Sequence, residues 1–263
     1  MDPTIRTKLD NHIIAAQALF YRAMENGLFE ILPDWVRGKS GVQIPSFNIF
    51  MPLNENGLDD EVFADTAAFF NSQRVVYAIE LIHDHLPHGP DYLNKRRYQP
   101  LPPQPAMLMS ELPTNLKQNA KVRIERVKTV PAHTAFYTTL HAVFDYNIDD
   151  VVQLFPVRHL NENQIHTIRH YLAFVDDQPV GTGSIICKHG VASVWNLCTI
   201  DAYRRQGIAN TLLYTMLNEA NKDGYDLAML YATAQSYQLF NQFGFDIFTQ
   251  RQWFLPPSIQ YAD

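Results

Sequence analysis

The sequence has few cysteines, no long hydrophobic run and no block of charge of one sign. Only two cysteines, Cys187 and Cys198, occur among 263 residues. This argues against a disulfide framework, and we expect two buried thiols in a reducing compartment. No apolar run approaches membrane-spanning length, and no apolar secretory segment follows the first residues. We therefore expect a cytoplasmic protein without a membrane partner.

The net charge of −6 comes without any cluster of lysine or arginine. This distribution argues against nucleic acid as the main partner. Hydrophobic residues make up 46% of the chain, so a sizeable core can be buried and disorder is not expected. The length suits one large domain or two modest ones.

The most informative segment is Arg204–Ala209, which lies between a strand-like run and an amphipathic helix. The run Val194–Ile200 is β-branched, aromatic and nearly uncharged, as a buried strand should be. After the segment, apolar residues recur at helical spacing until Asp223 and Gly224, at positions Ile208, Leu212, Leu213, Met216, Leu217 and Ala220. The start of a helix after a glycine turn favours an anion, and two arginines suit phosphate. The alternative is an ordinary close-packing glycine at a strand-to-helix turn.

This segment resembles the acyl-CoA-binding signature of the GNAT superfamily of N-acetyltransferases, Gln/Arg-x-x-Gly-x-Gly/Ala. Arg204, Gly207 and Ala209 take the first, fourth and sixth positions. Downstream, Ser236–Phe245 resembles the second helix of the family and the start of its next strand. The resemblance implies an α/β (α+β) fold with a mixed, mostly antiparallel sheet flanked by helices. It also implies transfer of an acetyl (acyl) group from acetyl-CoA to a primary amine by direct attack in a ternary complex.

Residues 121–263 follow the order of the family with few gaps. We expect strands at 122–127, 169–175, 180–187, 191–200, 227–231 and 245–249, and helices from 131, near 149–155, at 208–220 and at 234–243. The joints Asp176-Asp177-Gln178 and Lys188-His189-Gly190 carry hairpin turn residues. Residues 121–263 are therefore the expected catalytic domain.

The N-terminal half repeats part of this order, which suggests a degenerate second copy, as in tandem members. We expect helices at 4–24, 59–70 and 90–94, and strands at 47–51, 75–81, 97–100 and 106–112. The turn Pro52–Leu58 is acidic and lacks the glycine signature, so this half is not expected to bind CoA. The alternative is an unrelated α/β domain. We expect this domain at 1–112 and a linker at 113–120, because 100–113 is rich in proline and 114–120 is polar.

The resemblance also assigns the residues that would contact the cofactor. Backbone N–H groups from Arg205 to Asn210 would bind the pyrophosphate, and the strand edge would pair with the pantetheine arm. The expected cofactor-binding residues are Leu197, Cys198, Thr199, Arg204, Arg205, Gln206, Gly207, Ile208, Ala209, Asn210, Thr233 and Phe240.

The catalytic residues depart from the family pattern. Phe240 stands where many members have the tyrosine that protonates the thiolate, and Ala228 stands where some have a glutamate base. Tyr237, one turn before Phe240, is the best substitute acid, and Asn196 is a candidate for contact with substrate or a relay water. Tyr231 is a second candidate for contact with substrate or a relay water. For both Asn196 and Tyr231, the alternative is an ordinary hydrogen-bonded structural group.

Several alternatives stay open at this point. The chain could be an acyl-CoA-binding sensor or scaffold without catalysis, or a nucleotide-binding protein using the same turn. The segment His83–His88 crowds three histidines and an aspartate, but the spacing favours a solvated turn over zinc, and we expect no metal. Cys198 could carry an acyl group, although a buried structural thiol is the better reading. The acceptor amine is not specified by the sequence.

Overall fold

The computed structural model describes residues 1–111, 118–144, 146–160 and 166–257, without the side chains of 158 and 159. The chain divides into two compact units. The first unit comprises Met1–Ala16 and Met107–Asp246, and the second comprises Gln17–Ala106 and Ile247–Asp263. The expected linker at 113–120 lies partly outside the described residues, so a domain division there stays a prediction.

The first unit contains a sheet in the order β6-β11-β10-β9-β8-β7. It contains residues 3–16 of α1 (Pro3–Ala23) and residues 107–109 of β6 (Gln104–Met109). Its other elements are β7 (Arg123–Arg126), α4 (Val130–Phe144), α5 (Ile148–Leu154), β8 (Ile168–Val175), β9 (Gln178–Lys188), β10 (Val191–Thr199), α6 (Ile208–Lys222), β11 (Leu227–Tyr231) and α7 (Tyr237–Phe243). Strands β7 to β10 pair antiparallel, and β10 pairs parallel with β11. This is the expected mixed, mostly antiparallel sheet.

Two tight hairpins hold β8, β9 and β10 together. Asp176 and Asp177 have φ of +48° and +62°, and His189 and Gly190 have φ of +52° and +76°. Paired left-handed residues define the two-residue turns that match the twist of antiparallel strands. Both joints therefore fold as their turn residues predict.

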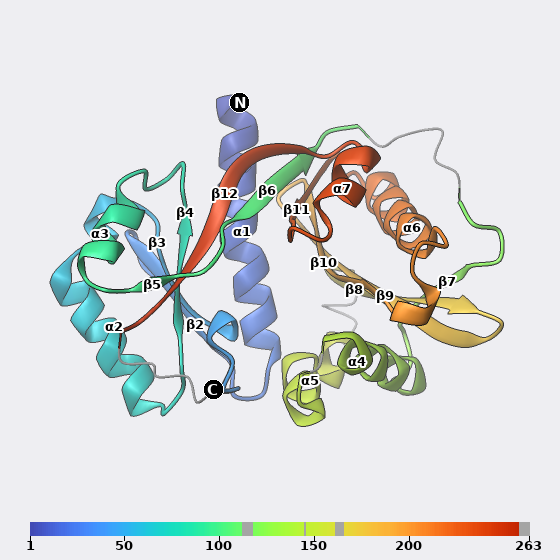
Figure 1. Cartoon of the computed structure of the whole chain (residues 1–263), viewed down its shortest axis with the longest axis horizontal. Coiled ribbons are helices and arrows are strands. Elements are labelled where there is room, and N and C mark those ends of the chain that lie inside the picture. The colour runs from blue at the N-terminus through green and yellow to red at the C-terminus, as the bar shows by residue number, and fades with distance from the viewer. Residues whose placement is uncertain (112–117, 145, 161–165, 258–263) are drawn as a thin grey trace. The chain divides into compact units, whose positions relative to one another are not determined.

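Helix α6 lies on one face of this sheet, and α4 and α5 lie on the other (Figure 1). The buried stripe of α6 includes Leu212, Met216 and Leu217. The end of the Met216 side chain packs directly against Gly183 on β9, where an added Cβ would lie 2.7 Å from its sulfur. The stripe predicted from the sequence is thus the face that packs on the sheet.

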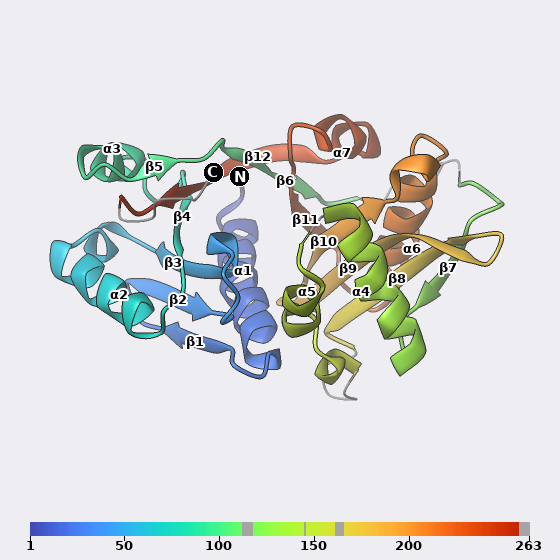
Figure 2. The same ribbon diagram turned by 60° about the horizontal axis from the view of Figure 1, so that its bottom comes forward.

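The second unit has strands in the order β1-β2-β3-β4-β12, with β5 paired to β12. Its elements are residues 17–23 of α1, β1 (Leu28–Ile31), β2 (Trp35–Lys39), β3 (Asn48–Pro52), α2 (Asp60–Ser72), β4 (Ala78–Ile82), α3 (Gly89–Lys95), β5 (Gln99–Pro100), residues 104–106 of β6, and β12 (Asp246–Leu255). Helix α2 lies along the meander β1–β3 (Figure 2), where Phe63 packs 5.3 Å from Phe50. Strands β3 and β4 are parallel and are connected in the sequence through α2. Strands β10 and β11 of the first unit are likewise parallel and connected through α6.

Strands β1 and β2 were not predicted, because charged residues interrupt their apolar pattern. Arg37 is buried on β2, where it pairs with Glu30 and with Asp65 at 2.7 Å. Its guanidinium also lies 4.1 Å from the ring centre of Phe69. A paired and stacked arginine can be buried in a strand, and only the tertiary partners reveal this. The other elements begin and end within a few residues of the prediction, except β12, which extends six residues further, to Leu255.

Candidate acyl-CoA site

Strand β10 is interrupted by a bulge at the centre of the first unit. Its pairing with β9 runs from Val191 to Trp195, then resumes at Cys198, so Asn196 and Leu197 lie opposite the single residue Gly183. Asn196 has φ of +53°, a left-handed conformation that asparagine tolerates better than most residues. The bulge turns the strand and changes the direction of its peptide groups.

Before it reaches the bulge, β10 also loses its neighbour on the other side. In the described residues, the recorded pairing of β10 with β11 ends at Ser193 opposite Met229. Trp195, Asn196 and Leu197 are half-buried rather than buried. The two strands therefore leave a strand edge whose peptide groups can pair with an extended amide-containing ligand.

The turn after β10 leads into the N-terminus of α6 through two left-handed residues. Arg205 has φ of +61° and Gly207 has φ of +75°. A left-handed arginine costs about 1–2 kcal/mol of strain, and such strain is concentrated at functional sites. Gly207 is the N-cap of α6, and no side chain caps this helix. The first helical bond runs from Thr211 N to Gly207 O, so the preceding N–H groups have no acceptor within the helix and can serve an anion.

Local contacts hold this turn in place. The Arg204 Nε donates to Thr199 O at 3.3 Å, and its Nη2 lies 2.7 Å from Asp201. Asn119 Nδ2 donates to Gln206 O at 2.8 Å, and Asn119 N donates to Thr211 Oγ1 at 3.0 Å. Arg204 therefore braces the turn, whereas the exposed Arg205 is free of such a role in the described contacts. Asn119 was not predicted, because it is distant in sequence.

The structure places the predicted residues on three neighbouring parts of one unit. Leu197, Cys198 and Thr199 lie on β10, residues 204–210 form the turn and the first turn of α6, and Thr233, Tyr237 and Phe240 follow β11. Ile208 is buried under the turn, while Ala209 and Asn210 are half-buried.

Helix α7 offers less for proton transfer than for packing. Phe240 is buried, with its ring centre 6.0 Å from that of Phe245. Tyr237 is half-buried and packs against the hydrophobic core that includes Phe240 and Phe245. The Thr233 hydroxyl lies 3.0 Å from the Ser236 hydroxyl, in a local cap at the start of α7. These contacts stabilise the helix, and the roles of the three predicted residues stay predictions.

The thiol of Cys198 lies 3.1 Å from the Thr182 hydroxyl on β9. Both cysteines are free and buried, as expected. Burial raises the pKa of the Cys198 thiol, and hydrogen bonds from Thr182 only partly oppose this. Because the thiolate is the nucleophilic form, the environment favours a structural thiol.

The side chain of Asn196 belongs to a polar network that was not predicted from the sequence. Asn196 Nδ2 donates to Ser184 Oγ at 3.2 Å, and Ser184 Oγ lies 2.8 Å from His170 Nδ1. The three residues come from three adjacent strands. His170 on β8 and Ser184 on β9 lie far apart in the sequence. The register of the two strands places them directly opposite each other.

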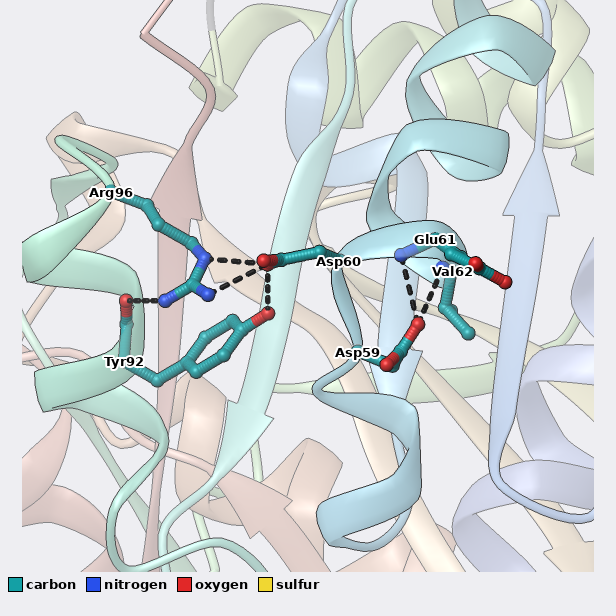
Figure 3. Close-up of polar contacts among 6 residues, drawn as sticks. All are labelled: Asp59, Asp60, Glu61, Val62, Tyr92 and Arg96. Carbon is teal, nitrogen blue, oxygen red and sulfur yellow. Dashed lines mark hydrogen bonds and ion pairs between the residues drawn. The ribbon is translucent and has the colours of Figure 1, made fainter.

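The second unit has a counterpart of this turn, and there an aspartate caps the helix. The N-cap Asp59 accepts from Glu61 N at 2.8 Å and from Val62 N at 3.4 Å, so the aspartate occupies the helix start (Figure 3). The carboxylate of Asp60 accepts from Arg96 and Tyr92, and these hydrogen bonds lower the pKa of Asp60. A negatively charged N-terminus repels phosphate. The charge at this helix start supports the expectation that the N-terminal half does not bind CoA, which stays a prediction.

We predict that Asp59→Ala lowers stability without creating a second cofactor site. Loss of an aspartate N-cap costs about 1 kcal/mol, which thermal unfolding would detect. Asp60 and Glu61 stay at the helix start, so calorimetry with acetyl-CoA should give the same stoichiometry as the wild-type protein. A second equivalent of bound acetyl-CoA in this variant would contradict the prediction.

The histidine-rich segment after β4 forms a turn. His83 Nε2 lies 3.0 Å from Gln252 Oε1, and His83 N donates to Gln250 O. Within the described ranges, His, Cys, Asp and Glu side chains nowhere gather in a group of three or more that could hold a metal ion. None of the described helices has the length and apolar character that a membrane crossing requires.

The bulged strand, the uncapped helix and the open strand edge lie together on one mixed sheet. Residues 166–247 match the family model described as Acetyltransferase (GNAT) domain. The match covers strands β8 to β11 with helices α6 and α7, and the resemblance seen in the sequence is confirmed. This family supports acyl transfer as the class of chemistry, with acetyl-CoA as the donor used by its members.

Solved structures extend the likeness to nearly the whole chain. A GCN5-related N-acetyltransferase from Kribbella flavida is similar with a TM-score of 0.72 at 15% identity, covering 94% of this chain and 95% of that one. One from Sphaerobacter thermophilus has a TM-score of 0.63 at 13% identity, covering 90% and 85%. A tandem GNAT protein from the clavulanic acid biosynthesis pathway has a TM-score of 0.59 at 9% identity, covering 84% and 78%. Among curated proteins, no sequence matches this chain significantly. The two-unit architecture is therefore that of tandem GNAT folds.

Proposed function

We propose that this chain is an acyltransferase that moves the acetyl group of acetyl-CoA to a primary amine by direct attack in a ternary complex. The observation that carries the proposal is the uncapped N-terminus of α6 directly after the bulged, half-unpaired strand β10. Together they supply donors for a pyrophosphate and a strand edge for an amide-containing arm. When bound, acetyl-CoA supplies the thioester that carries the acetyl group.

The residues of the chain have distinct roles in this proposal. N–H groups of Ile208, Ala209 and Asn210 bind pyrophosphate oxygens, and the exposed Arg205 adds positive charge. Peptide groups of Leu197 and Cys198 pair with the pantetheine arm. A backbone N–H of the bulge donates to the carbonyl oxygen on which charge develops during amine attack.

Ala228 stands where some relatives carry the glutamate base for proton transfer. The acceptor amine must lose a proton, and the departing thiolate must gain one. Tyr237 is the residue we propose for the second step, in place of the missing tyrosine at Phe240. The thiol of CoA has a pKa near about 8.5, so water can also protonate it. We further propose a cytoplasmic location and residues 121–263 as the catalytic domain.

A non-catalytic acyl-CoA sensor or scaffold is the second candidate. Two observations favour it: Phe240 is buried and has no proton to give, and Ala228 replaces the glutamate of some relatives. Turnover of an added amine separates the candidates, since a sensor binds acetyl-CoA without producing free CoA. A nucleotide-binding protein would bind ADP as tightly as CoA.

The first experiment is calorimetry and thermal shift with acetyl-CoA, CoA and ADP, followed by an amine panel. We expect acetyl-CoA to raise the melting temperature by mass action, with ADP much weaker. The panel of spermidine, kanamycin, lysine and a peptide with a free N-terminus then measures CoA release. Binding without turnover of any amine would support the sensor, and equal binding of ADP would support a nucleotide site.

A further inference from the structure

Asn119 contacts the turn before α6 only through its hydrogen-bond donors. Its Nδ2 donates to Gln206 O at 2.8 Å, and its backbone N donates to Thr211 Oγ1 at 3.0 Å. Its two acceptors are used by its own segment, where Oδ1 accepts from Lys121 N at 2.9 Å and the backbone O accepts from Val122 N at 3.0 Å. Each polar group of Asn119 therefore has a partner, and none of these partners is an N–H group at the start of α6.

These partners also fix which way the Asn119 amide faces. Gln206 O is a carbonyl oxygen and can only accept a hydrogen bond, whereas Lys121 N can only donate one. An amide turned by half a rotation would place Oδ1 against the carbonyl oxygen and Nδ2 against the N–H group, so both contacts would be lost. The side chain consequently has one orientation, with its donor directed at the turn.

The hydrogen bond to Gln206 O determines the direction of the next N–H group. The peptide between Gln206 and Gly207 is trans and planar, so its carbonyl oxygen and its N–H point in opposite directions. Because Gln206 O is directed at Asn119, the Gly207 N–H points away from Asn119. Among the described residues this N–H has no hydrogen-bond acceptor. The contact thus aims a free donor away from the residue that holds the peptide.

Thr211 extends the same restraint to the following peptide. Its hydroxyl accepts from Asn119 N and donates to Gly207 O at 3.0 Å, and its backbone N donates to the same oxygen at 3.0 Å. Thr211 is 3% exposed, so water has little access to these bonds. The carbonyl oxygens of both peptides that flank the Gly207 Cα are therefore held, while the N–H groups of residues 208–210 have no acceptor within the helix.

The start of α2 in the second unit uses a polar side chain in the opposite way. Asp59 accepts from Glu61 N and Val62 N, so its carboxylate occupies donors at the helix start. Asn119 instead donates to oxygen atoms of the turn and leaves the helix-start donors to a ligand. It also adds no negative charge beside the positive end of the helix dipole. A side chain that donates suits a helix start that binds an anion.

We propose that Asn119 is a positioning residue for the cofactor, which holds the peptide between Gln206 and Gly207 so that the Gly207 N–H donates to the pyrophosphate of CoA. This rests on the proposed function, in which the start of α6 binds that pyrophosphate. Donors that are already oriented bind an anion more tightly, because no rotation has to be frozen on binding. Asn119 belongs to the segment expected as a linker, 113–120, so the part of the chain that serves the cofactor begins before residue 121.

Calorimetry with CoA on the full-length chain tests this role. Asn119→Ala removes the donor to Gln206 O, and we expect the dissociation constant for CoA to rise about tenfold, the effect of one misplaced hydrogen bond to a charged group. Asn119→Asp keeps the acceptor for Lys121 N but puts a negative charge where Nδ2 was, so it should bind CoA more weakly still. With the panel amine of highest turnover, the KM for acetyl-CoA should rise in proportion, whereas kcat and the amine KM stay unchanged.

Asn54→Ala is the matched control. Asn54 is a half-buried asparagine of the second unit whose Oδ1 accepts from Asn56 N at 3.0 Å and whose Nδ2 donates to Asp34 Oδ1 at 3.0 Å. Its replacement should lower the melting temperature by a similar amount and leave CoA binding unchanged. If Asn119→Ala binds CoA as the wild-type protein does, or if Asn54→Ala loses the same affinity, the positioning role is wrong.

The Gly207 amide gives a second measurement that needs no acceptor amine. Its ¹⁵N–¹H signal, assigned by its loss in Gly207→Asn, should move downfield when CoA is added to the wild-type protein, because a hydrogen bond to an anionic oxygen is short and strong. At saturating CoA the movement should be smaller in Asn119→Ala. A wild-type Gly207 signal that bound CoA does not move would overturn the inference even if amines are turned over.

The same measurements separate this inference from the proposed function. Movement of the Gly207 signal that depends on Asn119, without turnover of any amine, would contradict acetyl transfer and support the positioning role. Turnover with equal CoA affinity in the wild-type protein and Asn119→Ala would support acetyl transfer and contradict the positioning role. Failure of the wild-type protein to bind CoA would overturn both.

Discussion

Replacing Gly207 with valine is expected to abolish acetyl-CoA binding while the protein stays folded. Gly207 has φ of +75° and ψ of +8°, and a Cβ there would have only ordinary contact, 3.8 Å from Asn119 Cβ. Space is therefore not the obstacle. The left-handed backbone costs a β-branched residue about 1–2 kcal/mol or more, and the turn relieves the strain by changing its dihedral angles.

The altered dihedral angles at position 207 would displace the N–H groups that we propose to bind the pyrophosphate. Gly207 O accepts the first helical bond of α6, and the N–H groups that follow it in the same turn have no acceptor within the helix. Rotation of these peptides removes several charge-assisted donors together, each worth about 1.5–3 kcal/mol. We expect the dissociation constant to rise at least a hundredfold in calorimetry, with amine turnover lost in proportion.

Gly224→Val is the matched control for this change. Gly224 follows the other end of α6, has φ of +87°, and a Cβ added there would have no neighbouring atom within 4 Å. Both variants carry the same backbone strain, so both should lose similar thermal stability. Only Gly207→Val should lose binding. Gly207→Asn should recover part of it, because asparagine tolerates the left-handed region. Equal loss of binding in Gly224→Val would point to α6 stability rather than to the turn.

Much of the first unit was predictable because its signals are local. The hairpin at Asp176 and Asp177, the stripe of α6 and the turn at Gly207 each depend on residues close in sequence. Turn chemistry and helical periodicity act over these short distances. The residues of the proposed anion site therefore stand in one segment, and a motif can reveal them.

The remaining features depend on partners far apart in the chain. Arg37 is compatible with β2 only through Glu30, Asp65 and Phe69, and Asn119 braces a turn 87 residues away. The bulge at Asn196 has no signature beyond one polar residue in an apolar strand. The boundaries of the two units fall inside α1, inside β6 and at the start of β12. Only the boundary inside β6 lies in the proline-rich stretch, and the other two have no signal in the composition. Sequence order cannot supply such pairings, because they follow from register and packing.

The second large effect is expected at Gly181, where alanine should destabilise the protein and weaken acetyl-CoA binding. A Cβ at Gly181 would lie 2.7 Å from the carbonyl oxygen of Cys198, which belongs to the backbone of the bulged strand. Gly181 pairs with Thr199, the second residue after the bulge. A backbone atom cannot rotate away, so β9 and β10 must separate locally. Overpacking of this kind costs about 1–3 kcal/mol.

Gly183→Ala supplies the comparison two residues along the same strand. A Cβ there would lie equally close, 2.7 Å from the sulfur and 2.8 Å from the terminal carbon of Met216. Those atoms are the end of a flexible side chain that can adopt another rotamer. We therefore expect Gly183→Ala to melt within a few degrees of the wild-type protein and to bind acetyl-CoA normally.

Gly181→Ala should melt several degrees lower and bind at least tenfold more weakly, since the shifted Cys198 peptide is part of the proposed pantetheine edge. Thermal unfolding and calorimetry on the pair decide the matter: equal melting temperatures, or undiminished binding in Gly181→Ala, would mean that the edge of β10 after the bulge does not hold the ligand.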